Sequence, residues 1–342
     1  MRRWLASLLL LFVGASVGAG FWFQRGLKPV DPASKTPVTV EVPAGASTAQ
    51  VAERLKAAGV IADPLIFRLW VRKEGKDGQI KSGEYQLTAS LSAEEILAKL
   101  ISGEVVIRRV ILPEGLTIAE IAERVAASGM TTKEAFLQAA HQPMTVGDVA
   151  PVMGVKEPLE GYLFPAAYDW ERSTTAEALV KRMTEQYAAL WTPAWKAQAA
   201  TLGLTVHQVT TLASIVQGEA GKVTEMPRIA GVYLNRLRDN WPLQADPTVY
   251  YALGKPKGEA LLYKDLEIDS PYNTYKVPGL PPGPIAAPGK AALEAVLFAE
   301  KHPYFYFVAK ADGSNEHFFA ETLEQHNENV AKAEANATQK KP

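Results

Sequence analysis

The stretch TVHQVTTLASIVQGEAG, residues 205–221, predicts a helix whose two ends are both marked. Thr205 and Gln208 have the spacing of a capping box, in which side chain and backbone bond reciprocally at a helix start. Gly221 stands where a helix commonly ends on a left-handed residue. We therefore expect one helix between these signals, with its domain packed around it.

Glu219 is the acidic residue of this stretch, and it projects into an apolar stripe. At 100° per residue, Leu212 and Ile215 lie within about 40° of it, whereas Gln217 lies on the opposite face. A buried carboxylate must be paired, metal-bound or protonated. The raised pKa that burial produces suits a general acid near neutral pH. The helix alone leaves open whether Glu219 is such an acid or a core glutamate salt-bridged to an arginine.

Composition bounds the class of protein. The chain has 342 residues, 47% apolar and 21% charged, which is ordinary for a globular protein of two domains. Its formal net charge of -1 gives no electrostatic basis for binding nucleic acid. The absence of cysteine from the sequence excludes disulfides and thiol chemistry, and it fits an extracytoplasmic chain without requiring one.

An uncharged apolar run over residues 4–23 predicts a single membrane-spanning helix with aromatic residues at both ends. Arg2 and Arg3 favour an N-terminus on the cytoplasmic side, although Arg25 and Lys28 after the run weaken that asymmetry. A cleaved signal peptide is the alternative, with small residues near a cleavage point at Ala15, Gly18 and Gly20. The run exceeds a typical signal-peptide core, so we favour an uncleaved anchor. Both interpretations carry the remainder across the membrane.

An internal repeat follows a proline-containing linker. VEVPAGASTAQVAERLKAAG, residues 40–59, aligns without gaps with VILPEGLTIAEIAERVAASG, residues 110–129. Each copy predicts a β-prone run, a turn and a helix that opens on a capping box. We expect the shared Ala-Glu-Arg segments to form the exposed helical face, with a structural role.

The whole pattern predicts an α+β protein. Helices are expected over residues 174–190 and 225–240, and a hairpin joins residues 304–309 to residues 316–320. The predicted divisions are an N-terminal stub and anchor (1–25), a linker (26–37), a small α+β module (38–142), a larger α+β domain (143–330) and a disordered tail (331–342).

The common nucleotide, zinc-protease, serine-hydrolase and calcium motifs do not occur at usable spacing in the sequence. The five histidines are scattered without ligand spacing. We therefore predict neither a metal nor a cofactor.

Polar and aromatic residues follow Glu219 in the segments VYLNRL, LQADPTV and YNTY. Amides, hydroxyls and tyrosines beside one protonatable glutamate form a set suited to a carbohydrate. Taken singly, each residue also has a structural explanation, as a turn, a cap or part of the core. The candidates are Asn235, Arg236, Gln244, Asp246, Thr248, Asn273 and Tyr275.

These segments resemble the endolytic murein transglycosylases, the YceG-like family. The resemblance rests on LASIVQGEAG, GVYLNRL, LQADPTVYYALG, SPYNTYKVPGLPPGPIAAPG and YFYFVA, with SGEYQLT, PEGLTIAEIAERV and LEGYLFPAAY upstream. Their order and spacing fit over nearly everything after the linker. The resemblance places the essential acid on Glu219, whereas the family's preceding glutamate is Gln217 here. Because Gln217 projects to the far face, we expect the chemistry to be kept.

The resemblance implies a single-pass inner-membrane enzyme with a LysM-like module and an extracytoplasmic catalytic domain. Such enzymes cut the MurNAc-β-1,4-GlcNAc bond of nascent peptidoglycan without adding water, which leaves 1,6-anhydroMurNAc ends and limits strand length. One glutamate can act as acid and then as base, unlike the carboxylate pair of most hydrolases. The implied partners are peptidoglycan strands, the membrane and membrane-bound peptidoglycan synthases.

The resulting hypothesis assigns acid and base roles to Glu219 and sugar binding to Gln244, Asn273 and Tyr275, with Asp246 orienting a neighbour. The other predicted substrate-binding residues are Asn235, Thr248, Glu160 and Tyr162. Two rivals stay open. Asp246 at hydrolase spacing from Glu219 would make a muramidase-type hydrolase, and a non-catalytic peptidoglycan-binding scaffold would need no acid.

Overall fold

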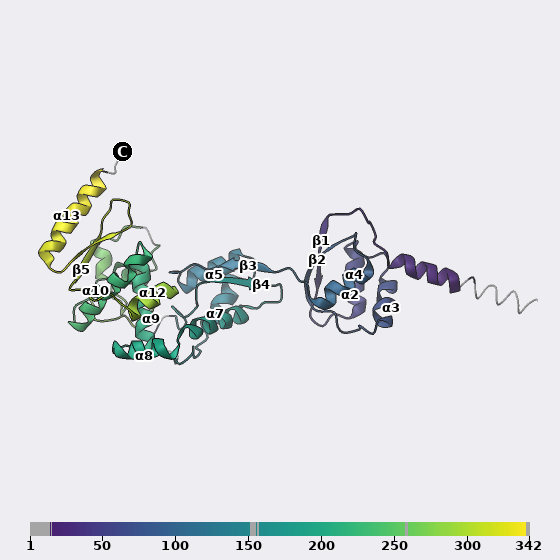
Figure 1. Cartoon of the computed structure of the whole chain (residues 1–342), viewed down its shortest axis with the longest axis horizontal. Helices are drawn as coiled ribbons and strands as arrows, with labels where there is room; N and C mark the ends of the chain where they lie inside the picture. The colour runs from purple at the N-terminus through teal and green to yellow at the C-terminus, as the bar shows by residue number, and fades with distance from the viewer. Residues whose placement is uncertain (1–13, 15, 151–154, 156, 257–258, 340–342) are drawn as a thin grey trace, which may run out of the picture. The chain divides into compact units, whose positions relative to one another are not determined.

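The computed structural model describes residues 14, 16–150, 155, 157–256 and 259–339, which form two compact units (Figure 1). The first contains the described residues up to Arg109 together with Asp169–Thr174. The second contains Val110–Tyr168 and the described residues from Thr175 onward. The described residues contain helices and small two-stranded sheets, so the predicted α+β class is confirmed.

The first unit is built on an antiparallel pair of strands, β1 (Pro37–Val42) and β2 (Gly83–Thr88). Pro37 lies opposite Thr88 and Val42 opposite Gly83. The buried side chains of both strands join a core with three helices, α2 (Thr48–Ala57), α3 (Pro64–Lys73) and α4 (Ala93–Ser102). Tyr85, at the middle of β2, is fully buried and donates its hydroxyl to the carbonyl of Lys81.

The second unit is mostly helical. Its helices are α5 (Ile118–Ala127), α6 (Lys133–Ala140), α7 (Ala176–Leu190), α8 (Pro193–Thr201), α9 (Val206–Glu219), α10 (Met226–Arg238), α11 (Asp246–Leu253), α12 (Lys290–Leu297) and α13 (Leu323–Gln339), with short 3-10 turns at Val223–Glu225 and Tyr263–Glu267. A two-stranded sheet of this unit pairs β5 (Tyr306–Ala309) with β6 (His317–Ala320). The remaining sheet pairs β3 (Arg108–Ile111) with β4 (Ala167–Trp170), and the division between the units runs through these two strands.

Helix α9 lies at the centre of the second unit, where α8, α10, α11 and α12 all pack against it. Residues 209–216 are all buried, so the helix is enclosed on every side. The sequence predicted one apolar stripe on this helix, whereas the structure buries all its faces over residues 209–216. The first turn (206–208) and the last turn, which carries Gln217 and Glu219, reach partly exposed surroundings.

The predicted helix starts are confirmed. Complete capping boxes open α2 at Ser47, α4 at Ser92, α5 at Thr117 and α9 at Thr205. In each, the side-chain oxygen accepts the amide three residues on, and that residue's side chain accepts the cap's own amide. These ends are local, so four residues of sequence suffice to predict them.

The repeat is divided between the units, with α2 in the first and α5 in the second. Ala52 and Ala122 are fully buried, so the shared Ala-Glu-Arg segments are not wholly exposed as expected; only their charged residues face outward. The small alanine side chains let each helix lie close to its core. The domain boundary at residues 142 and 143 stays a prediction, although compactness groups α5 and α6 with the second unit.

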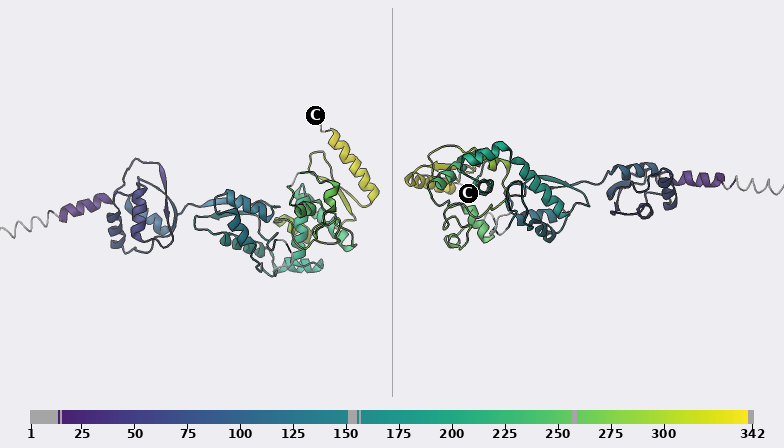
Figure 2. Two further views of the ribbon diagram at one scale, coloured as in Figure 1. Left: turned by 180° about the vertical axis from the view of Figure 1, so that it is seen from behind. Right: turned by 90° about the horizontal axis from the view of Figure 1, so that it is seen from below.

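The hairpin at the C-terminal end is confirmed, with Tyr306 opposite Ala320 and Ala309 opposite His317. The tail expected to be disordered is helical as far as Gln339, because α13 packs along both strands (Figure 2). Side-chain amides of Asn329 and Asn336 donate to backbone carbonyls of this region and fasten the helix.

Most of the predicted membrane span, residues 4–23, lies outside the described residues. The described residues 16–26, which include the end of that span, are helical. Within the described part of the chain, no single helix has the length and apolar composition to cross a bilayer. Helices α8 and α9 meet that criterion only as a pair bent by 83°, and α9 is a buried core helix.

Gly221 ends α9 in a different way from the one predicted. It has no positive φ, and the capping residue Ala220 is extended at φ -68° and ψ 118°. A Cβ on Gly221 would lie 2.4 Å from the backbone oxygen of Asn315, in the β5–β6 connection. Glycine is therefore needed because another backbone approaches closely.

We predict that Gly221→Ala and Gly221→Asn both destabilise the protein by about 1–3 kcal/mol, because either Cβ must displace the hairpin connection. Urea unfolding measures the change, with Ala220→Gly as the neighbouring control. A left-handed position would tolerate asparagine better than alanine. Full stability of the asparagine variant would therefore contradict the close-approach explanation.

Candidate active site

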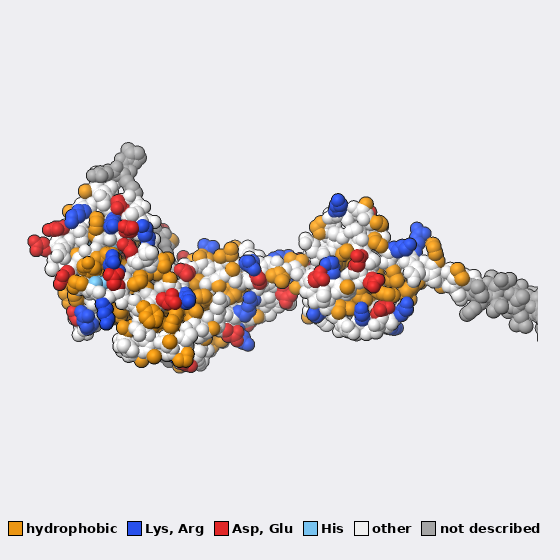
Figure 3. All heavy atoms as spheres, in the orientation of Figure 1, with side chains coloured by type: hydrophobic (Ala, Val, Ile, Leu, Met, Phe, Trp, Pro, Cys, Tyr) orange, Lys and Arg blue, Asp and Glu red, His pale blue; other side chains and the backbone are white. Residues whose placement is uncertain are grey.

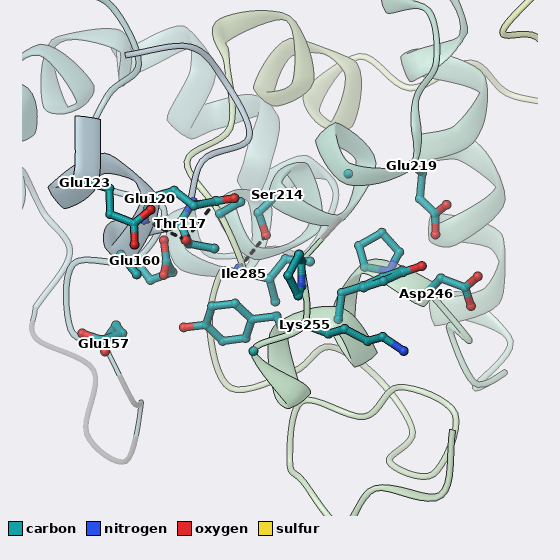
Figure 4. A pocket seen from close by; sticks show the side chains of 18 residues that line it. Thr117, Glu120, Glu123, Glu157, Glu160, Ser214, Glu219, Asp246, Lys255 and Ile285 are labelled. Atoms are coloured by element: carbon teal, nitrogen blue, oxygen red, sulfur yellow. Dashed lines mark hydrogen bonds between the residues drawn. The ribbon is translucent and has the colours of Figure 1, made fainter. Parts of the chain in front are cut away.

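A cavity of about 580 Å³ opens in the second unit beside the end of α9 (Figure 4). Its walls come from the start of α5, the segment around Glu157 and Glu160, the length of α11 and the chain at Ile285. Glu219 and Asp246 lie together at one end, whereas Glu160 and Glu157 lie at the other. The cavity thus holds several carboxyl groups in two separate places.

Glu219 is the last residue of α9 and points into the cavity. The hydroxyl of Tyr233 donates to its Oε1 at 2.7 Å. Tyr233 comes from α10, is 1% exposed, and packs edge-on against Phe307 of β5 with ring centroids 5.7 Å apart. The Tyr233 hydroxyl is therefore rigidly held, and Oε2 of Glu219 is the carboxyl oxygen free to face the cavity.

The surroundings of Glu219 raise its pKa to about 7. Loss of water around the carboxyl is the largest cause, and the negative charge of Asp246 adds to it. The Tyr233 hydrogen bond and the charge of Arg236 act in the opposite direction. At neutral pH the group is thus divided between acid and carboxylate.

The salt-bridge interpretation of Glu219 does not hold. None of the ion pairs within 4.0 Å among the described residues includes this carboxyl. Arg236, the nearest candidate, is buried and donates to the backbone oxygens of Phe305 and Leu243. Its guanidinium thus fastens the residue before β5 to α10.

Asp246 is the first residue of α11 and the second carboxyl at this end of the cavity. It is exposed, and the hydroxyl of Tyr275 donates to its Oδ1 at 2.6 Å. Tyr275 thus reaches the site through Asp246, although it does not line the cavity.

Three predicted substrate-binding residues use their side-chain donors for hydrogen bonds to backbone carbonyls of the protein. The Asn235 amide donates to the carbonyls of His302 and Tyr304. The Asn273 amide donates to those of Leu266 and Ile268, and the hydroxyl of Thr248 donates to that of Ala245. All three side chains are buried and none lines the cavity. They hold loops together, and the sugar-binding roles expected of them find no support in this arrangement.

Gln244 and Tyr162 also lie outside the cavity lining. Gln244 is exposed at a positive φ of 49°, and its backbone amide donates to the carbonyl of Thr274. Tyr162 is buried, with its hydroxyl 2.5 Å from Nδ1 of His207. Of the predicted site residues, the structure therefore brings Glu219, Asp246 and Glu160 to one cavity.

Glu160 is 2% exposed at the far end of the cavity. Both its oxygens accept the amide of Ile118, at 3.2 and 3.3 Å, at the start of α5. Tyr251 lies beside it. Burial is the largest cause that raises the pKa of Glu160, to about 8, and the nearby Glu157 adds to it.

Tyr233 was missed by the sequence analysis as a site residue. A tyrosine at the 3.6-residue spacing of Ile229, Val232 and Arg236 fits the packed face of its helix, which gives its ring a structural role. A buried tyrosine hydroxyl requires a hydrogen-bond partner, and that requirement was the available signal. The cavity residues Glu157, Tyr251 and Lys255 carried no comparable signal.

Gln217 does not line the cavity. Its side-chain oxygen accepts the amide of Gly289, at 3.0 Å, just before α12. This residue therefore joins two core helices, in agreement with its predicted orientation away from Glu219. Within the described part of the chain, no cluster of three or more His, Asp or Glu could hold a metal ion.

These features define an α+β domain with one half-buried acid, held by a tyrosine, in an open cavity. The chain belongs to the YceG-like family, whose pattern it matches over residues 40–332. The family predicted from the sequence is thus confirmed.

Named relatives agree with this assignment. The chain is 37% identical over 325 residues to the endolytic murein transglycosylase of Bacillus subtilis, covering 91% of this chain and 89% of that protein. It is 33% identical over 361 residues to the protein of that name from Streptococcus pneumoniae, covering 97% and 65% respectively. A crystal structure of a YceG-like protein from Listeria monocytogenes superimposes with a TM-score of 0.60 at 35% identity, covering 86% of this chain and 99% of that one.

We predict that Glu160→Gln flattens the pH dependence of stability. The pKa of Glu160 is about 8 in the folded protein against an ordinary value of 4.5, so the folded state binds the proton more tightly. Its contribution to stability is therefore fully present below pH 4.5 and is lost as pH rises toward 8. Urea unfolding at pH 5 and pH 8.5 should show a smaller loss for the variant than for the parent.

The control for this experiment is Glu134→Gln, at an exposed position on α6. Glu219 keeps part of the pH dependence in every variant, since the pKa of its carboxyl is also raised. An unchanged difference between the two pH values in Glu160→Gln would contradict the assignment.

Proposed function

We propose that this protein is an endolytic lytic transglycosylase that cleaves the MurNAc-β-1,4-GlcNAc bond of peptidoglycan strands. The observation that carries the proposal is the Glu219 carboxyl, with its pKa near 7, bonded to Tyr233 in an open cavity. Relatives at 33–37% identity bear the name endolytic murein transglycosylase.

The proposed reaction uses Glu219 twice. The protonated carboxyl gives its proton to the glycosidic oxygen as the bond from muramic acid C1 to that oxygen breaks. The resulting carboxylate takes the proton of the C6 hydroxyl, whose oxygen bonds to C1 and closes the 1,6-anhydro ring. Glu219 ends protonated, no water is consumed, and one carboxyl group suffices.

Tyr233 has a defined part in this scheme. Its hydroxyl donates to Oε1, so Oε2 is the oxygen that exchanges a proton with the sugar. A hydrogen bond to a carboxylate is stronger than one to a neutral acid. Tyr233 therefore stabilises the charge that appears on Glu219 when the proton leaves.

A muramidase-type hydrolase is the second candidate, favoured by one observation. Asp246 lines the same cavity end as Glu219 and is held by Tyr275, as a carboxylate that activates water would be. The two reactions differ in their products. A hydrolase leaves reducing muramic acid, whereas a transglycosylase leaves the anhydro form.

The wider setting is part of the proposal. An anchor at residues 4–23 would hold the catalytic domain on the extracytoplasmic side of the cytoplasmic membrane. A LysM-like module over residues 38–142 would bind glycan, and the domain over residues 143–330 would cut it. Cutting of nascent strands close to the membrane would limit their length and favour contact with membrane-bound peptidoglycan synthases.

We predict that Glu219→Gln lowers the rate of strand cleavage by about 10²–10⁴-fold, because the amide can neither give nor take the proton. Gln217→Glu is the matched control, two residues earlier on the same helix. Its side chain keeps an acceptor for Gly289, so activity should be retained. Release of soluble fragments from purified sacculi measures both. Full activity of Glu219→Gln would contradict the role of Glu219, and an absence of release by the parent protein would favour a non-catalytic scaffold.

We predict opposite shifts of the pH profile for the two neighbours of Glu219. The protonated acid is required, so kcat/KM falls as pH rises through about 7. Tyr233→Phe removes a bond that lowers the pKa of Glu219, so this fall moves to higher pH with a reduced maximum. Asp246→Asn removes a charge that raises that pKa, so the fall moves to lower pH. Shifts in the same direction would contradict the electrostatic assignment.

We predict that mass spectrometry of a sacculus digest finds 1,6-anhydroMurNAc at the new ends. Digestion in H₂¹⁸O should leave these ends unlabelled, since no water enters the bond. Reducing MurNAc that carries ¹⁸O would instead establish the hydrolase.

A further inference from the structure

Helix α3 of the first unit carries an exposed stripe of alternating apolar and basic character. Leu65 and Leu69 are 48% and 42% exposed, although leucine normally lies inside. Arg68 and Arg72 are exposed between and beyond them, at spacings of three and four that share one helix face. The opposite face packs into the unit through Ile66, Phe67 and Val71.

The buried face of α3 contacts the end of the N-terminal helix. Gly26, at the end of the helical residues 16–26, approaches Ile66 so closely that a Cβ there would lie 2.1 Å from its Cδ1. Leu27 packs against the core of the same unit, and its carbonyl accepts the amide of Ala93. Helix α3 is therefore fixed beside the point where the N-terminal helix enters the unit (Figure 1).

The length of helix between the predicted span and this contact is short. Gly26 follows Phe23, the last residue of the span, by three positions, which is about 4.5 Å at 1.5 Å per residue. The headgroup region extends roughly 5–8 Å beyond the hydrocarbon core on each side. An anchor that ends at Phe23 would therefore hold the start of α3 within the headgroups.

Charge around α3 favours an anionic surface. Residues 63–77 contain three acidic side chains, and two of them are engaged: Asp63 caps the helix, and Asp77 pairs with Arg72 at 3.6 Å. The third is Glu74. The same residues contain four basic side chains, Arg68, Arg72, Lys73 and Lys76. Figure 3 shows hydrophobic, basic and acidic side chains intermixed on the surface of this unit.

We propose that α3 lies on the bilayer, with Leu65 and Leu69 inserted among the headgroups and Arg68 and Arg72 on anionic lipid phosphates. An exposed apolar stripe flanked by basic residues is the pattern of interfacial helices. The proposal rests on the membrane anchor proposed above, and it is independent of the reaction at Glu219. It gives the unit two attachments to the membrane, which fix its tilt as well as its height.

The test uses the chain's lack of cysteine, which allows a single nitroxide label at any chosen residue. Full-length Leu69→Cys is labelled and reconstituted into vesicles of phosphatidylcholine and phosphatidylglycerol in a 3:1 ratio. Electron paramagnetic resonance then compares collisions of the label with oxygen and with a water-soluble nickel complex. The control is Gln86→Cys, exposed on the outer side of β2 in the same unit.

We expect the label at residue 69 to be shielded from nickel at least threefold relative to the label at residue 86. Arg68→Glu combined with Arg72→Glu should remove most of this shielding, and vesicles of phosphatidylcholine alone should weaken it. Circular dichroism of each variant establishes that the unit is folded.

Flotation of the same vesicles separates the possible failures. The protein could float while the label at residue 69 is as accessible to nickel as the label at residue 86. That result would support the membrane anchor and contradict the docking of α3. Protein that does not float overturns both. Neither result bears on the reaction, which is measured on sacculi with the same preparations and should be unchanged in the arginine variants.

Discussion

The structure depends on a carboxyl group held at the end of a helix that is buried on every side. Desolvation favours the neutral form of Glu219, and the C-terminal end of α9 carries partial negative charge that acts in the same direction. One hydrogen bond from Tyr233 opposes both. The balance places the pKa near neutrality, where one group can give a proton and take it back.

The elements around α9 maintain that balance through a closed path of contacts. The chain leaves α9 through Gly221, which lies against the β5–β6 connection. The same hairpin supplies Phe307, which packs against the ring of Tyr233, and Tyr233 returns to Glu219. Arg236 of α10 donates to the carbonyl of Phe305, the residue just before β5. The hairpin thus positions the acid, although its strands contribute no residue to the cavity lining among the described residues.

What the sequence could predict was local or periodic. Capping boxes, the C-terminal hairpin and the place of Glu219 at the end of its helix depend on residues close in the chain, and they agree with the structure. Asn235 and Asn273 donate to backbone carbonyls in the structure, and the sequence could not foresee this because an amide suits a sugar hydroxyl and a backbone carbonyl equally well. Only the folded chain decides which acceptor is nearer. Tyr233 was overlooked for the converse reason, since an aromatic ring in an apolar stripe conceals its hydroxyl.

The two copies of the repeat show how one local fold can serve different ends. Both helices open on a capping box and bury the corresponding alanine, so the repeat encodes packing. In the second copy, the amide of Ile118 meets the buried carboxyl of Glu160, and Glu123 lines the cavity. The first copy has Glu53 at the matching position, exposed in the other unit. A carboxyl at a helix start accepts a hydrogen bond from a free amide and fixes where the helix begins. Glu160 therefore holds the start of α5 in place where that helix lines the cavity.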